Sequence, residues 1–326
     1  MKLYETDANN FNDFSSAEPD ASIFQTSYWS DYMVSKGYKA SFIEASDEHG
    51  TCLALSSLLL KKESFLSSKY TALAPHGFLI NYYDEELFKT FHGLMSDYLK
   101  QERVSKLFIE PQVDKDNRMA EQMLEKLGYR KESDITVYEV DTAAHVNDLS
   151  DPNVILKVRV VKDDSVFRRL ASSKEEKEDL KIFEYLKDHA AVYIASIDTV
   201  KSIRAIGESM AQNDAFIKEH RSDYKFVEQV NEKDNENSRL KKLQAAIENY
   251  SADPDIAAYC VSDFSDKCTV LFKMNIDKDD LFKAEKIIVD QICADCLNRG
   301  IIKVDSEENF AYAVPRQLLG RYSLKI

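Results

Sequence analysis

One short stretch, residues 69–88, constrains the fold more than any other part of the chain. Two strand-like apolar runs, Tyr70 to Ala74 and Phe78 to Ile80, lie on either side of Pro75-His76-Gly77. Proline fixes the backbone angle φ and glycine frees it, so this tripeptide predicts a sharp turn that exposes His76 and nearby backbone N–H groups. Asp84 then has the position of a helix N-cap. The stretch predicts strand, ligand-holding loop and helix, although a plain hairpin before a helix would give the same pattern.

Composition sets the broad class of the protein. The chain has 326 residues, 44% hydrophobic and 31% charged, which is enough for two soluble domains with their own cores. No apolar run reaches the ~20 residues of a membrane span, and the N-terminal residues lack the apolar region of a secretory signal. The five cysteines show no paired framework, which fits a reducing compartment. We therefore expect a cytoplasmic protein.

Charge and glycine content limit the ligands. The formal net charge of −14 disfavours a broad electrostatic grip on a nucleic-acid backbone, so any nucleic-acid partner would need a local basic patch. Only 8 glycines are present, and the glycine-rich dinucleotide and P-loop patterns are both missing from the sequence. We expect no cofactor.

The first half of the chain alternates strand-like and helix-like segments. Residues 1–20 are polar and weakly patterned, which predicts only a short strand and a loop, and the segment around Trp29 predicts a helix that ends near Gly37. The other predicted strands are 40–45, 52–60, 106–109 and 135–140, and the other predicted helices are 84–102 and 117–127. This order favours a mixed sheet flanked by helices.

The second half follows a polar segment, residues 142–152, that is typical of a linker. Its predicted strands are 154–161, 192–197, 257–261, 269–274 and 300–305, and its predicted helices outside the amphipathic region described next are 172–189 and 281–297. The sequence thus predicts a second α/β unit.

A long amphipathic region interrupts that second unit. Apolar residues recur at gaps of three, four and seven from Val200 to Val230 and again from Leu240 to Tyr250, on either side of the polar run 231–237. Two amphipathic helices around a polar turn form an antiparallel hairpin. The longer helix would span about 45 Å, so we expect residues 199–251 to form an arm that projects from the body.

Several segments resemble motifs of the Fem family, the aminoacyltransferases that build peptidoglycan interpeptide bridges from aminoacyl-tRNA. Residues 69–88 are similar to the family's Y-x-P-R-G-P-x-x-D-Y-x-D-x-E-L-F segment, and Phe24-Gln-Thr-Ser-Tyr-Trp-Ser-Asp-Tyr32 to its Q-S-x-x-W opening. Leu107-Phe-Ile-Glu-Pro111 resembles F-x-x-x-D-P, Leu127-Gly-Tyr129 resembles L-G-Y, and Gly320-Arg-Tyr-Ser-Leu324 looks like the closing G-x-Y-x-L.

The resemblance implies a fold and a domain plan. It predicts an α/β (α+β) protein with two acetyltransferase-like domains built on mixed sheets, and with the helical-hairpin arm inserted in the second. The first domain would span residues 1–142, the second 143–198 and 252–326, and the arm 199–251. The implied partners are aminoacyl-tRNA and a nucleotide- or lipid-linked peptidoglycan precursor, which leaves a peripheral membrane contact open.

The resemblance also implies site residues. Family members carry a phosphate-binding lysine four residues after the tryptophan; Met33 stands there, and Lys36 is the nearest lysine. His76 replaces an arginine of the family loop. Glu110 replaces an aspartate, and its carboxylate would either orient the attacking amine or simply bond to a loop. Arg316 is the nearest cation to the family's oxyanion-stabilising position. Further substrate-binding candidates are Tyr70, Gly77, Tyr83, Arg168 and Arg169, the last two standing for an arginine-rich helix.

Three functions are compatible with these residues. The first is aminoacyl transfer to the stem-peptide amine of a peptidoglycan precursor. The second is partner binding by a degenerate Fem-like protein that has lost catalysis, which the changed family positions favour. The third is CoA-dependent N-acyl transfer, but the sequence lacks the glycine-rich loop that would hold the pyrophosphate.

The pair Cys293-Ala-Asp-Cys296 also has two interpretations. A C-x-x-C pair can bind zinc or perform redox chemistry, yet no second pair lies at ligand spacing. Both cysteines fall within a predicted helix, so we expect buried, unreactive and metal-free thiols.

Overall fold

The computed structural model describes the chain except residues 19–20, 144–150, 164, 171–179, 251–252 and 276–281. Its strands join into one mixed sheet of thirteen strands among the described residues, and the path runs β1-β2-β3-β4-β6-β13-β7-β12-β11-β10-β9-β8 with β5 paired to β3. The pairs β4–β6 and β11–β12 are parallel and the other named pairs are antiparallel. The expected mixed α/β class is confirmed.

The bounds of the elements follow the predicted pattern closely in the first half. The strands are β1 (Lys2–Glu5), β2 (Lys39–Ser46), β3 (Cys52–Lys62), β4 (Tyr70–Ala74), β5 (Leu79–Ile80), β6 (Val104–Ile109), β7 (Arg130–Asp141), β8 (Leu156–Val161), β9 (Ala190–Ile197), β10 (Asp255–Phe264), β11 (Lys267–Asn275), β12 (Lys303–Ser306) and β13 (Val314–Lys325).

Helices cover both parts of the sheet. The α-helices that matter here are α1 (Ala8–Ser16), α2 (Ser27–Ser35), α3 (Glu85–Gln101), α4 (Arg118–Lys126), α5 (Ser165–Leu170), α7 (Ile182–Leu186), α8 (Thr199–His220), α9 (Val227–Glu248) and α10 (Ala284–Asn298). Side chains of capping residues begin several of them: Asp84 accepts from the Leu87 N–H at α3, and Asp198 accepts from the Lys201 N–H at α8.

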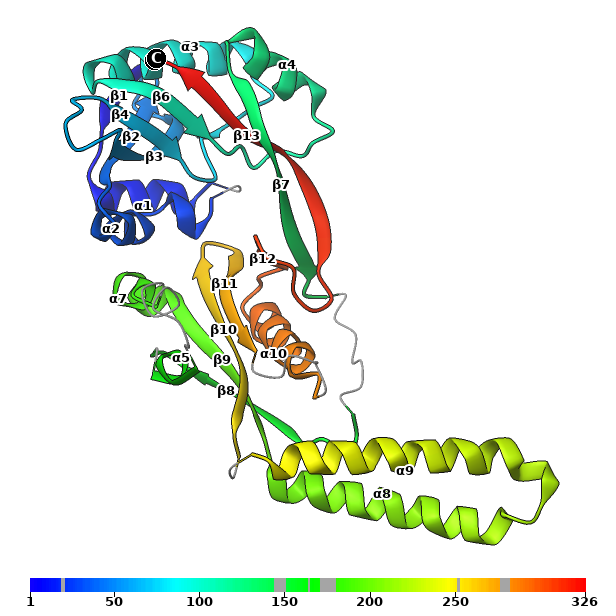
Figure 1. Cartoon of the computed structure of the whole chain (residues 1–326). Coiled ribbons are helices and arrows are strands. Elements are labelled where there is room, and N and C mark those ends of the chain that lie inside the picture. The colour runs from blue at the N-terminus through cyan, green and yellow to red at the C-terminus, as the bar shows by residue number, and fades with distance from the viewer. Residues whose placement is uncertain (19–20, 144–150, 164, 171–179, 251–252, 276–281) are drawn as a thin grey trace.

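Three apolar clusters hold these layers together. The first lies between α3, α4 and one face of the strands of the first half, and contains Phe88, Phe91 and Leu107. The second joins the two halves, because Phe24 and Tyr32 near α2 share it with Phe183 of α7 and with strands β9 and β10. Figure 1 shows α1 and α2 between the first part of the sheet and α7. The two halves are therefore joined by buried apolar surface.

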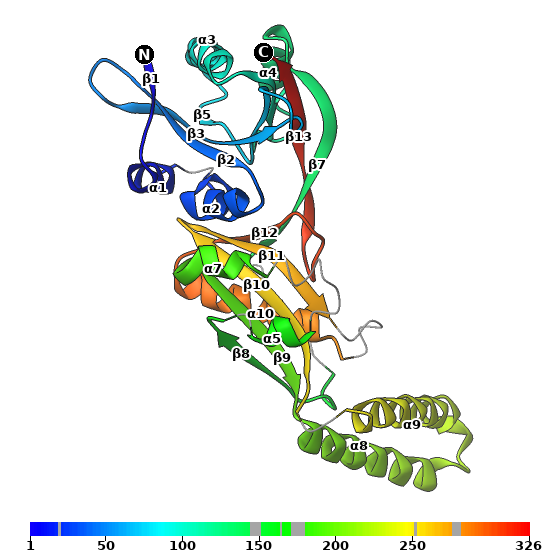
Figure 2. The same ribbon diagram turned by 60° about the vertical axis from the view of Figure 1, so that its left-hand side comes forward.

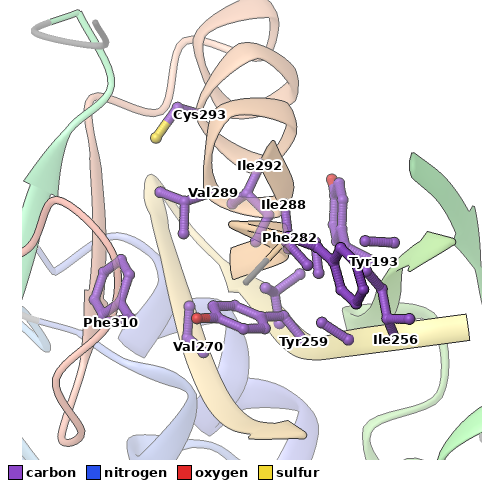
Figure 3. Packing of buried hydrophobic residues seen from close by; sticks show 14 of the residues in the cluster. Tyr193, Ile256, Tyr259, Val270, Phe282, Ile288, Val289, Ile292, Cys293 and Phe310 are labelled. Atoms are coloured by element: carbon purple, nitrogen blue, oxygen red, sulfur yellow. The ribbon is translucent and has the colours of Figure 1, made fainter. Parts of the chain in front are cut away.

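The third cluster packs α10 and the base of the arm onto the second part of the sheet. Figure 3 shows Tyr193, Tyr259 and Val270 on the strands facing Ile288, Val289 and Ile292 of α10. Ile206 of α8 and Leu240, Leu243 and Ile247 of α9 are fully or almost fully buried in the same cluster. The arm therefore shares its base with the core of the body.

The arm is present, but its turn is not where the sequence analysis placed it. Helix α8 ends at His220 and α9 already begins at Val227, so the polar run 231–237 lies within α9. The hairpin projects from the body (Figures 1 and 2). A buried hydrogen bond from Asn213 Nδ2 to Asn237 Oδ1, 3.0 Å long, connects the two helices. The polar run therefore continues helix α9, and Asn237 within it hydrogen-bonds to α8 where the two helices pack together.

The N-terminal prediction was also incomplete. Residues 8–16 form helix α1, which the polar sequence did not predict; Asp7 caps it by accepting from the N–H groups of Asn9 and Asn10, and Phe11 is its fully buried anchor. Of the predicted helix 172–189, residues 172–179 lie outside the described residues, as do residues 144–150 of the predicted linker. None of the helices in the described ranges combines the length and apolarity that a membrane span needs.

Strand β13 completes the first part of the sheet from far along the chain. It pairs antiparallel with β6, where Tyr322 lies opposite Ile109, and with β7, where Val314 lies opposite Glu139. Figure 1 shows β7 and β13 as two long neighbouring strands that reach from the first half toward the second. A segment that the domain plan assigned to the second domain thus lies between β6 and β7 of the first half. The division of the chain at 142 and 198 remains a prediction.

Candidate functional site

The turn at Pro75-His76-Gly77 is held in place by one buried glutamine. Gln25 is fully buried; its Nε2 donates to the Pro75 carbonyl oxygen, and its Oε1 accepts from the Ser57 N–H at 2.8 Å. A Cβ on Gly77 would lie 2.7 Å from Gln25 Nε2, so a side chain there would displace the Gln25 amide from the Pro75 carbonyl oxygen. The local sequence therefore forms the turn, and Gln25 fixes its position on the sheet.

The prediction that this turn exposes His76 is wrong. His76 is only 8% exposed, because the Phe24 ring covers its imidazole at a centroid distance of 4.2 Å. Its Nε2 lies 3.0 Å from Glu307 Oε1. This hydrogen bond lowers the pKa of the Glu307 carboxyl below its ordinary value, so the carboxylate accepts and Nε2–H donates. The imidazole is thus a held hydrogen-bond donor rather than a free loop side chain.

Glu110 lies directly beside this turn. It follows β6, is 6% exposed, and its backbone N–H donates to the Gly77 carbonyl oxygen at 3.3 Å. Two nitrogens of Arg321, Nε at 2.7 Å and Nη2, donate to Glu110 Oε1. Among the described residues nothing hydrogen-bonds to the second oxygen, Oε2. Glu110 is therefore an oriented carboxylate with one acceptor oxygen left for a ligand.

Together these residues form one polar cluster, which we define as His76, Gly77, Glu110, Glu307 and Arg321. Its members come from the β4–β5 turn, the end of β6, the segment after β12, and β13. The predicted residues His76, Gly77 and Glu110 are thus brought together, and each charged partner comes from more than 200 positions further along the chain.

A cavity of about 390 Å³ adjoins the cluster on the Arg321 side. Its lining combines apolar and charged side chains: Tyr38, Leu59, Lys61, Lys62, Glu63, Thr71, Leu73, Phe108 and Arg321. Three cations against one carboxylate make this a locally basic cavity in an acidic chain. Such a lining is suited to an anionic ligand with an apolar portion.

A second cavity, of about 260 Å³, adjoins the cluster on the Glu307 side. Trp29 is half-buried and lines this cavity, with Phe24, Tyr32, Ile182, Val270, Leu271, Phe272, Ser306, Glu307 and Glu308. The Trp29 and Phe24 rings meet edge to face at 4.6 Å. This cavity is aromatic with an acidic rim, so the polar cluster lies between a basic and an acidic recess.

Arg316 lies elsewhere. It lines a third cavity of about 270 Å³ together with Glu139, Asp305 and Lys303. Its Nε donates to Asp114 Oδ1 at 2.5 Å and its Nη1 to Glu139 Oε1 at 2.8 Å. No described contact connects it with Glu110, and the cation beside Glu110 is Arg321.

The other predicted residues are spread over the molecule. Lys36 is exposed at the end of α2, where its Nζ lies 5.2 Å from the Tyr32 ring centre. Tyr70 begins β4, and Tyr83 is 70% exposed before α3. Arg168 and Arg169 lie on α5, where Arg168 lies 3.8 Å from Glu184 and Arg169 3.0 Å from Asp255. None of these five has a described contact with the polar cluster.

Sequence reasoning missed Arg321, Glu307 and Gln25. Arg321 stands inside the closing motif Gly320-Arg-Tyr-Ser-Leu324, so that motif was the one available signal. Glu307 is one acid among 57 acidic residues, and Gln25 stands in the opening motif without any local sign of its role. Only the strand pairing brings them to the turn.

Among the described residues, Cys296 belongs to a group of possible metal ligands that does not include Cys293. Cys293 and Cys296 are both fully buried on α10, and Cys296 lies beside Cys268 of β11 and Asp263 of β10, with the three ligand atoms within 4.8 Å of one another. Arg299 donates to the Asp263 carboxylate through Nη1 and lies 3.5 Å from Cys296 Sγ. A guanidinium already occupies the carboxylate that a metal ion would need.

We therefore expect native Cys268, Cys293 and Cys296 to be unreactive and without metal. Burial raises the pKa of the Cys293 and Cys52 thiols alike to about 12, so accessibility rather than pKa should decide which thiol reacts first. Titration of the folded protein with an aromatic disulfide reagent should modify Cys52, which is half-buried, well before these three. Stoichiometric zinc in the purified protein, or rapid modification of all five thiols without unfolding, would contradict this expectation.

Comparison with known proteins identifies the first half. Residues 6–144 match the family model described as the FemAB family. Residues 6–144 are a FemAB-family region. The four motif segments that suggested the resemblance, 24–32, 69–88, 107–111 and 127–129, all lie within it, so the resemblance to this family is confirmed.

One solved structure extends the likeness in fold to the whole chain. The crystal structure of FemX is 13% identical, with a TM-score of 0.72 over 100% of this chain and 98% of that chain. A GCN5-related N-acetyltransferase from Sphaerobacter thermophilus is 10% identical, with a TM-score of 0.41 over 99% of this chain and 95% of that one. No curated protein sequence matches the chain. The FemAB region therefore belongs to a chain with the FemX fold.

Proposed function

We propose that this protein is a cytoplasmic aminoacyltransferase that moves an amino acid from aminoacyl-tRNA to the stem-peptide amine of a peptidoglycan precursor. The observation that carries the proposal is Glu110: a buried carboxylate in the FemAB region, fixed by Arg321, with Oε2 unused beside a basic cavity. Such an arrangement suits the binding and orientation of an amine.

The chemistry needs few groups from the protein. The amine nitrogen attacks the ester carbonyl carbon of the aminoacyl-tRNA, a C–N bond forms, and the ester C–O bond breaks. The ribose hydroxyl leaves with the proton that the amine loses. Glu110 Oε2 would accept a hydrogen bond from the attacking amine, and Arg321 would hold the Glu110 side chain in its orientation. Proximity and orientation would supply most of the rate.

Binding would use the basic cavity and further contacts outside the polar cluster. The basic cavity with Lys61, Lys62 and Arg321 would hold an anionic part of the precursor, with Lys36 at its phosphates as the family lysine would be. His76 would fix the turn that presents Gly77 to the substrate. We retain Arg316, which lines the third cavity, as an outer contact of the aminoacyl-tRNA rather than at the reacting carbonyl beside Glu110, and Tyr70, Tyr83, Arg168 and Arg169 as further outer contacts of the substrates.

One observation favours the partner-binding alternative. Arg316, the cation predicted for the oxyanion, is bonded to two carboxylates, Asp114 and Glu139. An arginine that must release an ion pair before it can stabilise an oxyanion fits a protein that has kept the fold and lost the reaction. CoA-dependent acyl transfer has no comparable support, since the glycine-rich loop is missing from the sequence.

A transfer assay decides between these functions. We expect radiolabelled amino acid to pass from a mixed aminoacyl-tRNA pool to a nucleotide- or lipid-linked muropeptide, and Glu110→Gln to lower kcat about 10²-fold with a small effect on KM, because the amide cannot hold the amine as a carboxylate does. Glu125→Gln, an exposed change on α4, is the matched control. No transfer to either acceptor, together with stable muropeptide binding, would favour the partner-binding function.

A further inference from the structure

The loop between β3 and β4, residues 63–69, carries the two most exposed large apolar side chains among the described residues. Phe65 is 96% exposed and Leu66 is 93% exposed, and they are adjacent in sequence. Single exposed apolar residues are ordinary, but an aromatic and an aliphatic side chain held together in water at a hairpin tip are costly unless something covers them. We call Phe65 and Leu66 the apolar tip.

Internal hydrogen bonds hold the loop that carries the apolar tip. The Glu63 N–H donates to the Lys69 carbonyl oxygen at 3.2 Å, and the Ser67 N–H donates to the Ser64 carbonyl oxygen at 3.1 Å. Ser67 Oγ accepts from the Lys69 N–H at 3.0 Å. The backbone is thus satisfied within the loop, and the tip side chains are presented outward by a fixed turn.

The charge around the tip has the opposite sign to the chain as a whole. Lys61, Lys62 and Lys69 flank it, against Glu63 alone, in a protein whose formal net charge is −14. Glu63 accepts a hydrogen bond from Ser105, and the Nζ of Lys61 lies 4.8 Å from the Tyr38 ring centre. An apolar pair ringed by lysines matches an anionic lipid surface, where the apolar side chains enter the acyl boundary and the ammonium groups remain at the headgroups.

We propose that the β3–β4 loop docks the protein on an anionic membrane surface by inserting Phe65 and Leu66. Lys61, Lys62 and Glu63 belong both to this loop region and to the lining of the basic cavity. Docking would therefore set the mouth of that cavity at the headgroup layer. This inference rests on the proposed function and narrows it. The acceptor would be the lipid-linked precursor.

Vesicle co-sedimentation of the full chain tests the docking directly. The probes are large unilamellar vesicles of phosphatidylcholine and phosphatidylglycerol at 7:3, and of phosphatidylcholine alone. We expect binding to the anionic vesicles that weakens with salt, a loss of at least tenfold in Phe65→Ser/Leu66→Ser, and a loss of about fivefold in Lys69→Ser on anionic vesicles only. Val200→Ser/Tyr224→Ser, which removes two exposed apolar side chains of the arm, should bind as wild type does.

The outcomes separate docking from catalysis. No binding of the wild type to anionic vesicles, or wild-type binding by Phe65→Ser/Leu66→Ser, would overturn the proposal. A wild-type dimer in sedimentation velocity that the double variant dissociates, without vesicle binding, would assign the tip to a second copy of the chain instead. Because vesicle binding needs no transfer, it can succeed where the transfer assay fails, and the double variant should retain transfer to a water-soluble acceptor.

Discussion

Replacing Gly320 by alanine is expected to destabilise the first half of the molecule by about 2–6 kcal/mol. Gly320 has φ +113°, which residues with a side chain rarely adopt, at a cost of about 1–3 kcal/mol. Its Cβ would also overlap the Ser133 carbonyl oxygen of β7 and lie 3.0 Å from Lys131 Cε. The backbone oxygen cannot move without breaking the β7–β13 pairing, so overpacking adds about 1–3 kcal/mol.

The measurement is urea unfolding followed by the fluorescence of Trp29, the single tryptophan, which lies on α2 in the first half. Gly93→Ala is the control, because a Cβ there meets nothing within 4 Å and Gly93 lies inside α3. Alanine should raise stability at that helical position by about 0.5–1 kcal/mol. Equal midpoints for Gly320→Ala and wild type would mean that β13 does not approach β7 as described.

Replacing Arg321 by alanine should lower the free energy of unfolding more than replacing Glu110 by glutamine does. Glu110 has a side chain only 8% exposed, whereas that of Arg321 is 47% exposed. Breaking a fully buried ion pair by deleting one partner costs about 3–5 kcal/mol. Since water reaches one side of this pair, we expect about 2 kcal/mol for Arg321→Ala. Glu110→Gln should cost only about 0.5–1.5 kcal/mol, because its amide oxygen can still accept from Arg321.

The double variant Arg321→Ala/Glu110→Gln gives the sharper test. It should be more stable than Arg321→Ala alone, since no buried carboxylate is left unpaired. Arg204→Ala is the matched control, because both side chains of the Arg204–Glu208 pair on α8 are exposed and the pair should contribute little to stability. Additive effects of the two single substitutions would show that Glu110 and Arg321 do not depend on each other. Arg321→Ala should also lower transfer activity, through the orientation of Glu110.

The sequence predicted the parts of this fold that local patterns determine. Helix α3 has its cap at Asp84 and apolar residues at helical spacing, and β3 is a nearly continuous apolar run, so both were predicted within a few residues. Helix α1 has few apolar anchors, Phe11 chief among them, and its asparagines favour turns as strongly as helices. The arm was predicted and its turn misplaced, because a charged run on the outside of a helix has the same composition as a turn.

The sequence predicted only part of the polar cluster. His76, Gly77 and Glu110 belong to one local motif and its neighbour in the sheet, so a resemblance along the first half was enough to find them. Their partners Glu307 and Arg321 depend on the register of β13 and the position of β12, which nothing in the local sequence encodes. Arg321, rather than Arg316, is the cation beside Glu110, because the five residues of β13 between them place the two side chains in different cavities.

The position of β13 has a consequence for how the protein is made. The ribosome completes β6 and β7 roughly 200 residues before it reaches β13, which at about 5–20 residues per second is a delay of about 10–40 s. During that time β6 has no antiparallel neighbour, and an unpaired strand edge is a template for aggregation. The nascent first half therefore keeps an unpaired edge at β6 until β13 has been translated. A premature stop codon shortly before β13 would damage the part of the protein that had been synthesised first.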